Sequence, residues 1–205
     1  MGGSGPGTDR AMKRITILGD EVQSGAYLLR LYVKEEKRVR FGRFQGGRPI
    51  LVPQGELLYI GSAMARKGSM TLARRLLRHA TRCNAKRPQV IRRSMLESFK
   101  EVGLGTAELD APRHKKLFWN IDYLLEEEVV ELSHVLILRT RVEMEDRLAH
   151  FLTGEPNSSI LAPGLGAHDK RGSTHILVTQ ELANWWQFLP QRLEVLLGQA
   201  EEIGD

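Results

Sequence analysis

The apolar positions in the first third of the chain alternate in a way that predicts paired β-strands. Residues 26–33 are rich in Leu, Tyr and Val, and the two-residue period of a strand places Tyr27 on one face with the other odd-numbered apolar residues. Residues 57–60 form a second apolar run. A charged loop over 34–48 and a short strand over 48–52 separate the two runs, so we expect antiparallel pairing.

The apolar period then lengthens to that of a helix. Over residues 69–80, Leu and Ala side chains fall on one side, and Arg74 and Arg78 lie opposite them. Arg75 and His79 are four residues apart and flank the apolar stripe, so they are expected to point along the edge of the sheet.

The rest of the chain completes a fold of the α/β class, in the α+β sense. We expect a small, mainly antiparallel central sheet flanked by helices. The further predicted elements are a helix over 89–101, a strand over 132–139, a helix over 142–152, a loop over 156–174, a strand over 174–178 and a final helix over 191–202. The predicted organisation is a flexible Gly-rich tail over 1–13, a domain over 14–180 with a basic insertion over 84–113, and a helical extension over 181–205.

One carboxylate stands out on the predicted helix over 142–152. On a helical wheel Glu145 falls in the middle of the apolar side, whereas Glu143 falls in the middle of the polar side. A carboxylate on a buried face is costly unless it is paired or binds a cation. Glu145 is therefore a candidate functional residue, and Glu143 is not.

Composition narrows the class of protein. Hydrophobic residues make up 41% of the 205 residues, which is enough for a folded core, and no stretch approaches the length of a membrane span. The single cysteine, Cys83, excludes an intramolecular disulfide and a cysteine-rich zinc site. We therefore expect no membrane partner and a cytoplasmic location, associated with the nucleoid in a bacterium.

Basic charge is concentrated in one segment. The net charge is +5, yet residues 61–100 contain eleven Lys and Arg and one acid, Glu97. Such a segment is typical of a surface that binds a polyanion, although a solvated helix face has the same composition. The candidate nucleic-acid-binding residues are Arg74, Arg78, Arg82, Lys86, Arg87, Arg92 and Arg93.

Short motifs in this order resemble the GIY-YIG nuclease superfamily. Its pattern is matched by Gly25-Ala26-Tyr27, Tyr59-Ile60-Gly61, Arg75 and Glu145. The chain is most similar to the branch described as domain of unknown function 123, through further matches at Ser62-Ala63, His79, Trp119 to Leu125, Leu148-Ala149, Gly164-x-Gly166, Asp169 and His175. The resemblance covers residues 25–177, with 84–113 as an insertion.

The resemblance implies a metal-dependent phosphodiesterase. It makes Glu145 the ligand of Mg²⁺ or Mn²⁺, Tyr59 the general base or the hydroxyl that positions water, and Tyr27 its strand neighbour. Arg75 would grip the scissile phosphate, because a planar guanidinium matches two oxygens, and His79 would carry a proton. His168, Asp169 and His175 could also suggest a metal site, but their order fits a loop of the family.

Three functions remain open from the sequence. The first is an endonuclease that acts on DNA, with branched, nicked or damaged forms as candidate substrates and a targeting protein as a candidate partner. The second is a non-catalytic nucleic-acid-binding module on the same fold, which Ser62 favours because DNA-repair relatives carry lysine there. The third is an interaction protein whose basic surface binds a protein. Trp185-Trp186 could stack bases, but packing is the simpler interpretation.

Overall fold

The fold is built around one six-stranded sheet. The structure is a computed structural model, and it describes residues 13–68, 70–112, 114–166, 174–180 and 182–204. The strand order across the sheet is β1 (Ile15–Gly19), β6 (Val130–Arg139), β2 (Gly25–Val33), β5 (Gly55–Ala63), β8 (Ile176–Thr179) and β7 (Ser158–Ile160). Only β1 and β6 pair in parallel, so the predicted mainly antiparallel sheet is confirmed.

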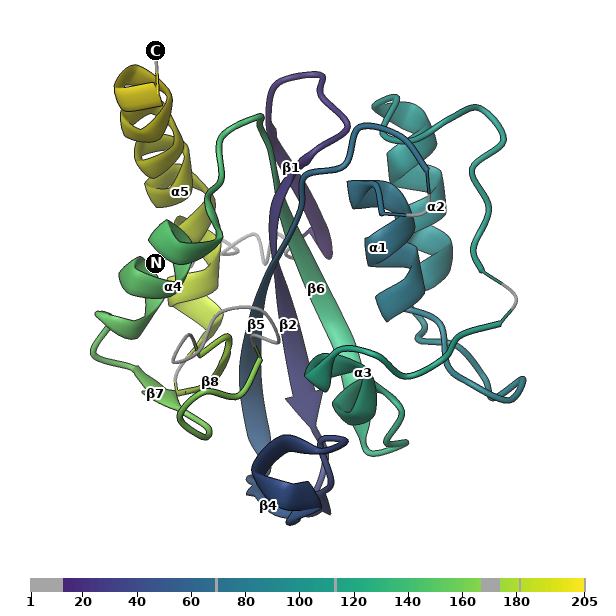
Figure 1. Cartoon of the computed structure of the whole chain (residues 1–205). Helices are drawn as coiled ribbons and strands as arrows, with labels where there is room; N and C mark the ends of the chain where they lie inside the picture. The colour runs from purple at the N-terminus through teal and green to yellow at the C-terminus, as the bar shows by residue number, and fades with distance from the viewer. Residues whose placement is uncertain (1–12, 69, 113, 167–173, 181, 205) are drawn as a thin grey trace, which may run out of the picture.

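Helices cover both faces of this sheet and give three layers (Figure 1). One face carries α1 (Leu72–His79), α2 (Arg92–Glu101) and α3 (Asn120–Leu125). The other face carries α4 (Glu145–Thr153) and α5 (Leu182–Gly204). No helix in the described ranges is long and apolar enough to cross a membrane.

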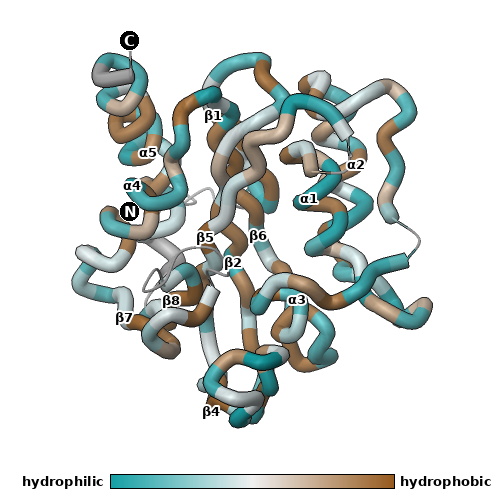
Figure 2. The backbone as a smooth tube through the Cα atoms, viewed as in Figure 1, coloured by the Kyte–Doolittle hydropathy of each residue, from teal (hydrophilic) through white to brown (hydrophobic). Residues whose placement is uncertain are grey.

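The central strand β2 shows why the sheet needs cover on two sides. Leu29 and Leu31 belong to the core under α1, α2 and α3, whereas Ala26 and Leu28 belong to the core under α4 and α5. All four side chains are fully buried. The central strands are accordingly hydrophobic over most of their length, as Figure 2 shows.

Two short strands lie outside the main sheet, in a region where we expected only one. β3 (Lys37–Val39) pairs with β4 (Ile50–Val52), and a 3₁₀ turn over Phe44–Gly47 lies between them. The loop expected over 34–48 therefore contains a strand. Val39 is buried in the core while its neighbour Arg38 is exposed, so this alternation was too short to recognise as a strand.

The segments predicted as an insertion and an extension both contribute to the core. Within 84–113, Met95 and Phe99 of α2 are fully buried against the sheet. Within 181–205, α5 begins before Pro190 rather than after it, and Leu189 is buried on the other face. Both helices thus pack against the central sheet.

Several smaller expectations also change. β1 was not predicted, and β7 lies inside the loop expected over 156–174. Trp186 of α5 is buried in the core between that helix and the sheet, which confirms that this side chain packs in the interior. The expected tail over 1–13, apart from Lys13, and the loop residues His168 and Asp169 lie outside the described residues.

Candidate active site

The two motif tyrosines come together because their strands pair in a fixed register. On β2 and β5, Tyr27 lies opposite Gly61, and Leu29 lies opposite Tyr59. Both tyrosine side chains therefore project to the face under α1, and their ring centroids are 6.3 Å apart. A Cβ atom at Gly61 would lie only 2.5 Å from the Tyr27 hydroxyl oxygen. The glycine of the second motif thus makes room for the tyrosine of the first.

His79 joins the tyrosines from the last turn of α1. Its Nε2 lies 2.8 Å from the Tyr27 hydroxyl oxygen, and its ring centroid is 5.9 Å from that of Tyr59. His79 is fully buried, and burial lowers its pKa from 6.5 to about 4. Burial also raises the pKa of Tyr27 above its usual range. At neutral pH both groups are therefore neutral, and a hydrogen bond joins the Tyr27 hydroxyl and His79 Nε2.

Arg75 and Glu145 come from opposite layers and meet at one end of β5. β8 pairs with Glu56 to Tyr59 of β5, and the Ile60 N–H donates to the His175 carbonyl oxygen, so within the described residues no named strand pairs with the last residues of β5 on this side. At this end of β5 the guanidinium of Arg75 donates to the Ser62 carbonyl, and the Ser62 hydroxyl donates to Glu145 Oε2. Ser62 thus connects the two functional side chains that the resemblance pointed to.

Glu145 keeps its negative charge in this setting. Partial burial alone would raise the pKa of its carboxyl group, but hydrogen bonds from His175 and Ser62 and the charge of Arg75 lower the pKa below its usual value. His175 Nδ1 lies 3.0 Å from Glu145 Oε1, and 27% of the Glu145 side chain remains exposed. The site therefore presents an ionised, accessible carboxylate.

The helix that carries Glu145 begins later than its sequence suggests. The Val142 N–H donates to the Thr140 hydroxyl oxygen, and Met144 precedes the first helical turn. Glu145 is then the first helical residue, and Glu143 lies outside the helix and is exposed. The predicted difference in burial between the two glutamates holds, although the helical wheel over 142–144 does not apply.

Asp122 is a buried residue of this site whose role was not predicted. Its carboxylate pairs with Arg78 at 3.0 Å and with the buried Lys115 at 3.1 Å, and it accepts the backbone N–H of Trp119. Burial would raise the pKa of Asp122, but His79, Lys115 and Arg78 together lower it well below its usual range. His79 Nδ1 lies 3.7 Å from Asp122 Oδ1. The sequence feature that could have revealed this role is the position of an acidic residue inside the apolar run over 119–125.

Trp119 connects this buried network with Arg75, which reaches Ser62 of β5. Its ring lies under two guanidinium groups, at 4.5 Å from Arg75 and 4.7 Å from Arg78, and its centroid is 5.9 Å from that of His79. Such cation–π contacts hold planar arginine groups in place. Trp119 therefore positions the arginine expected to grip phosphate.

Two polar atoms of the site are buried without a hydrogen-bond partner. Among the described residues three side-chain atoms have this property, and two of them are Arg75 Nε and His79 Nδ1. An unsatisfied buried donor is costly to stability. Unsatisfied atoms at both Arg75 and His79, one turn apart on α1, are typical of a functional site rather than of a region optimised for stability.

The candidate nucleic-acid-binding residues divide into two groups. Arg82 donates to the backbone carbonyl oxygens of Leu125, Glu127 and Val130, and Arg93 pairs with Glu97. Like these two, Arg78 and Arg92 have protein partners, the latter through a 3.5 Å contact with the Thr81 hydroxyl. The second group is the three candidates that are exposed and form no ion pair within the described part of the chain: Arg74, Lys86 and Arg87.

The fold and site define an α+β domain with a Tyr–Tyr–His cluster beside an arginine and a carboxylate at a strand edge. Residues 26–196 match the family described as "Domain of unknown function DUF123", and the chain belongs to that family. The match extends into α5, beyond the boundary at 180 that the sequence suggested. No curated protein and no solved structure matches the chain.

Proposed function

We propose that this protein is a divalent-metal-dependent DNA endonuclease of the GIY-YIG type that hydrolyses phosphodiester bonds in structured or damaged DNA. The observation that carries the proposal is the meeting of Arg75 and Glu145, from opposite layers, at Ser62 near the end of β5. Tyr27, Tyr59 and His79 form a contiguous cluster on the adjoining strands.

The hydrogen bond between Tyr27 and His79 supports a route for a proton. Both tyrosine hydroxyls are protonated at neutral pH, because burial raises the pKa of each. Neutral His79 can accept the Tyr27 proton at Nε2 while Tyr27 takes a proton from an attacking water. The nearby charge of Asp122 would stabilise the imidazolium that forms. Tyr27 is thus better placed to act as the base than Tyr59, which we expected in that role.

Arg75 would bind the phosphoryl group. Its guanidinium is fixed by the Ser62 carbonyl and by the Trp119 ring, so it loses little conformational freedom on binding. Its unsatisfied Nε supports an anionic partner at this site. In this role Arg75 stabilises the charge that develops on the phosphate oxygens.

The residues at the edge of β5 fit a single hard cation. Glu145 is ionised and partly exposed, and it offers carboxylate oxygens, which Mg²⁺ and Mn²⁺ prefer. No group of three or more His, Cys, Asp or Glu that could hold a metal ion occurs among the described residues. This suits Mg²⁺, which keeps most of its water ligands. When bound at Glu145, the ion would supply charge neutralisation at the phosphate.

A second candidate is a non-catalytic nucleic-acid-binding module. The burial of both tyrosines favours it, since Tyr27 is only 1% exposed and Tyr59 only 4% exposed. The exposed cations Arg74, Lys86 and Arg87 would serve this function without any contribution from Glu145.

An assay of the parent chain and the Glu145→Gln variant on branched, flapped and nicked DNA distinguishes the endonuclease from the binding module. We expect the parent chain to cleave with Mg²⁺ or Mn²⁺, and the variant to lose cleavage while it retains DNA binding. Glu143→Gln is the matched control, because Glu143 is exposed and lies just outside the same helix. Binding without cleavage by the parent chain would support the module instead.

A further inference from the structure

Three cations that have no acidic partner surround a cavity beside α1. The cavity has a volume of about 270 Å³ and is lined by Arg66, Lys67 and Arg74. All three side chains are exposed, and none forms an ion pair within the described ranges. The remaining described residues that line the cavity are uncharged. This cleft, called here the Arg74 cleft, therefore has a strong positive potential.

The walls of the Arg74 cleft are held together by Gln23. Its side-chain Nε2 donates to the Gly103 carbonyl oxygen at 2.9 Å, and its Oε1 accepts the Gly105 N–H at 2.6 Å. Its backbone carbonyl oxygen accepts the N–H of Leu72, at the start of α1. One residue thus ties the loop after α2 to the helix that carries Arg74. The cleft is pre-formed, which lowers the entropic cost of binding.

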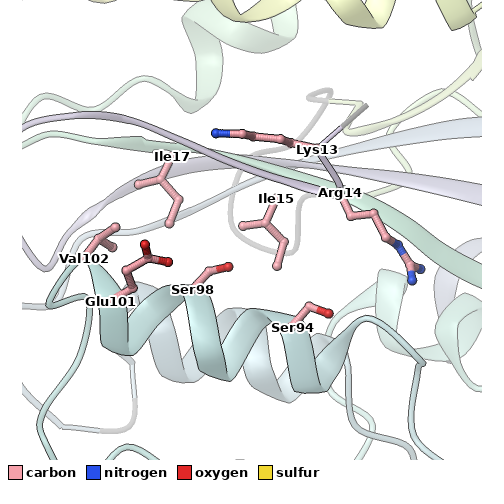
Figure 3. A pocket seen from close by; sticks show the side chains of 8 residues that line it. All are labelled: Lys13, Arg14, Ile15, Ile17, Ser94, Ser98, Glu101 and Val102. Carbon is pink, nitrogen blue, oxygen red and sulfur yellow. The ribbon is translucent and has the colours of Figure 1, made fainter. Parts of the chain in front are cut away.

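Two other hollows in the molecule differ from this cleft in charge. A groove of about 510 Å³ lies between β1 and α2 and contains both Lys13 and Glu101. Figure 3 shows Glu101 of α2 facing Ile17 of β1 across that groove. On the other side of Arg74, a hollow of about 230 Å³ contains Glu108 and Asp110. Among these three, only the Arg74 cleft has cations as its sole charged residues.

The Arg74 cleft also adjoins the candidate active site. Arg74 and Arg75 are consecutive in α1, so their side chains leave the helix about 100° apart. Arg75 reaches the edge of β5 at Ser62, whereas Arg74 lines the cleft. A polyanionic strand that passes Arg75 can therefore place a neighbouring phosphate at Arg74.

We infer that the Arg74 cleft binds a phosphate group, with Arg66, Lys67 and Arg74 as its cationic ligands. Guanidinium groups match the oxygens of phosphate in pairs, and the ammonium of Lys67 adds a compact charge. The volume lies below the range of pockets that hold drug-sized ligands, which suits a single phosphate. The assignment of that phosphate to a nucleic-acid strand, at its end or within it, rests on the proposed function.

Titration of the ¹⁵N-labelled full chain with inorganic phosphate tests the cleft itself. Sodium chloride at matched ionic strength is the reference. We expect saturable shifts of the Gly68 and Gly105 amide signals with phosphate only. In the triple variant R66Q/K67Q/R74Q, apparent affinity should fall roughly tenfold or more, because charge-assisted hydrogen bonds are lost. Shifts that fail to saturate, or that chloride reproduces, would overturn the inference.

The double variant R38Q/R40Q is the matched control. It removes two exposed cations that lie outside both the Arg74 cleft and the basic segment over 61–100. We expect it to bind phosphate as the parent chain does. An equal loss in both variants would show that general charge, and not the cleft, attracts phosphate.

Duplexes with a 5′-phosphate or a 5′-hydroxyl at a nick identify the source of the phosphate. Their binding is compared by fluorescence anisotropy without divalent cations. A preference for the phosphorylated nick that the triple variant loses assigns a terminal phosphate. If both duplexes bind equally and the triple variant weakens both to the same extent, the cleft binds a phosphate within the strand. Binding that the triple variant leaves unchanged argues against a nucleic-acid phosphate in the cleft.

The outcomes of the two proposals are separable. Saturable phosphate binding without any DNA cleavage would leave the cleft in place and contradict the endonuclease. Cleavage by the parent chain without phosphate-specific shifts would contradict the cleft alone.

Discussion

The Tyr27 hydroxyl oxygen lies 2.8 Å from Nε2 of His79, and both side chains are buried. This contact fixes the neutral form of the imidazole with its Nδ1 directed to Asp122, 3.7 Å away. In the proposed mechanism the imidazole is the acceptor for the Tyr27 proton, and burial raises the pKa of that hydroxyl.

The first prediction concerns the pH dependence of stability. His79 has a pKa of about 4 in the folded chain and an ordinary value of 6.5 when unfolded. The unfolded chain thus binds more protons between these values, so stability is fully present above pH 6.5 and is lost as the pH falls towards 4. The loss should approach about 1.4 kcal/mol per pH unit. Urea unfolding of the parent chain and of His79→Gln between pH 7 and 4.5 measures it.

A second histidine provides the control for this experiment. Burial and the charge of Arg30 also lower the pKa of His134 to about 4. The variant His134→Gln should remove a separate part of the acid sensitivity. A His79→Gln chain whose stability falls with pH as steeply as that of the parent would contradict the burial of a neutral imidazole.

The second prediction concerns Gly61. A Cβ atom there would overlap the Tyr27 hydroxyl and ring, at 2.5 to 2.8 Å, so Gly61→Ala should destabilise the fold by about 1–3 kcal/mol. Gly198→Ala should instead stabilise it by about 0.5–1 kcal/mol, because Gly198 lies in α5 with open space around it. Thermal melting distinguishes the two. Equal melting temperatures for Gly61→Ala and the parent would contradict the observed packing of the tyrosine.

The third prediction separates structural arginines from exposed ones. Arg82 donates to three backbone carbonyl oxygens, at Leu125, Glu127 and Val130, which an ammonium group cannot reach together. Arg82→Lys should therefore cost about 1–3 kcal/mol of stability although charge is conserved. Arg87→Gln should leave stability within about 0.5 kcal/mol, because Arg87 is exposed. Chemical denaturation gives both values. A larger loss in Arg87→Gln would reverse the assignment.

The fourth prediction concerns the buried pair of Asp122 and Lys115. Asp122→Asn leaves the fully buried Lys115 ammonium without its strongest partner, so it should destabilise the chain by about 3–5 kcal/mol. Lys115→Met in the same chain should recover part of that loss, because the uncompensated charge is removed. Unfolding curves of the single and double variants provide the coupling energy. Additive losses would show that the two charges do not interact.

Local patterns were sufficient to predict much of this fold. The alternation over 26–33 and the helical period over 69–80 depend on neighbouring residues only, so the strand with Tyr27 and the helix with Arg75 and His79 were predictable. The contrast in burial between Glu145 and Glu143 was predicted correctly, but Glu143 lies outside the helix, so helical periodicity is not the reason for its exposure. The motif residues could be chosen from their order and spacing.

The tertiary structure decided the rest, because it depends on contacts between distant segments. Arg75 and Glu145 belong to helices on opposite faces of the sheet, and only the packing of both helices against β5 brings them together at Ser62. The sequence shows basic residues but not their partners, so it could not separate Arg82, bound to carbonyl oxygens 43 to 48 residues away, from the unpaired Arg74. Hydrophobic periodicity predicts which face of an element is buried; only the packed chain determines what lies against it.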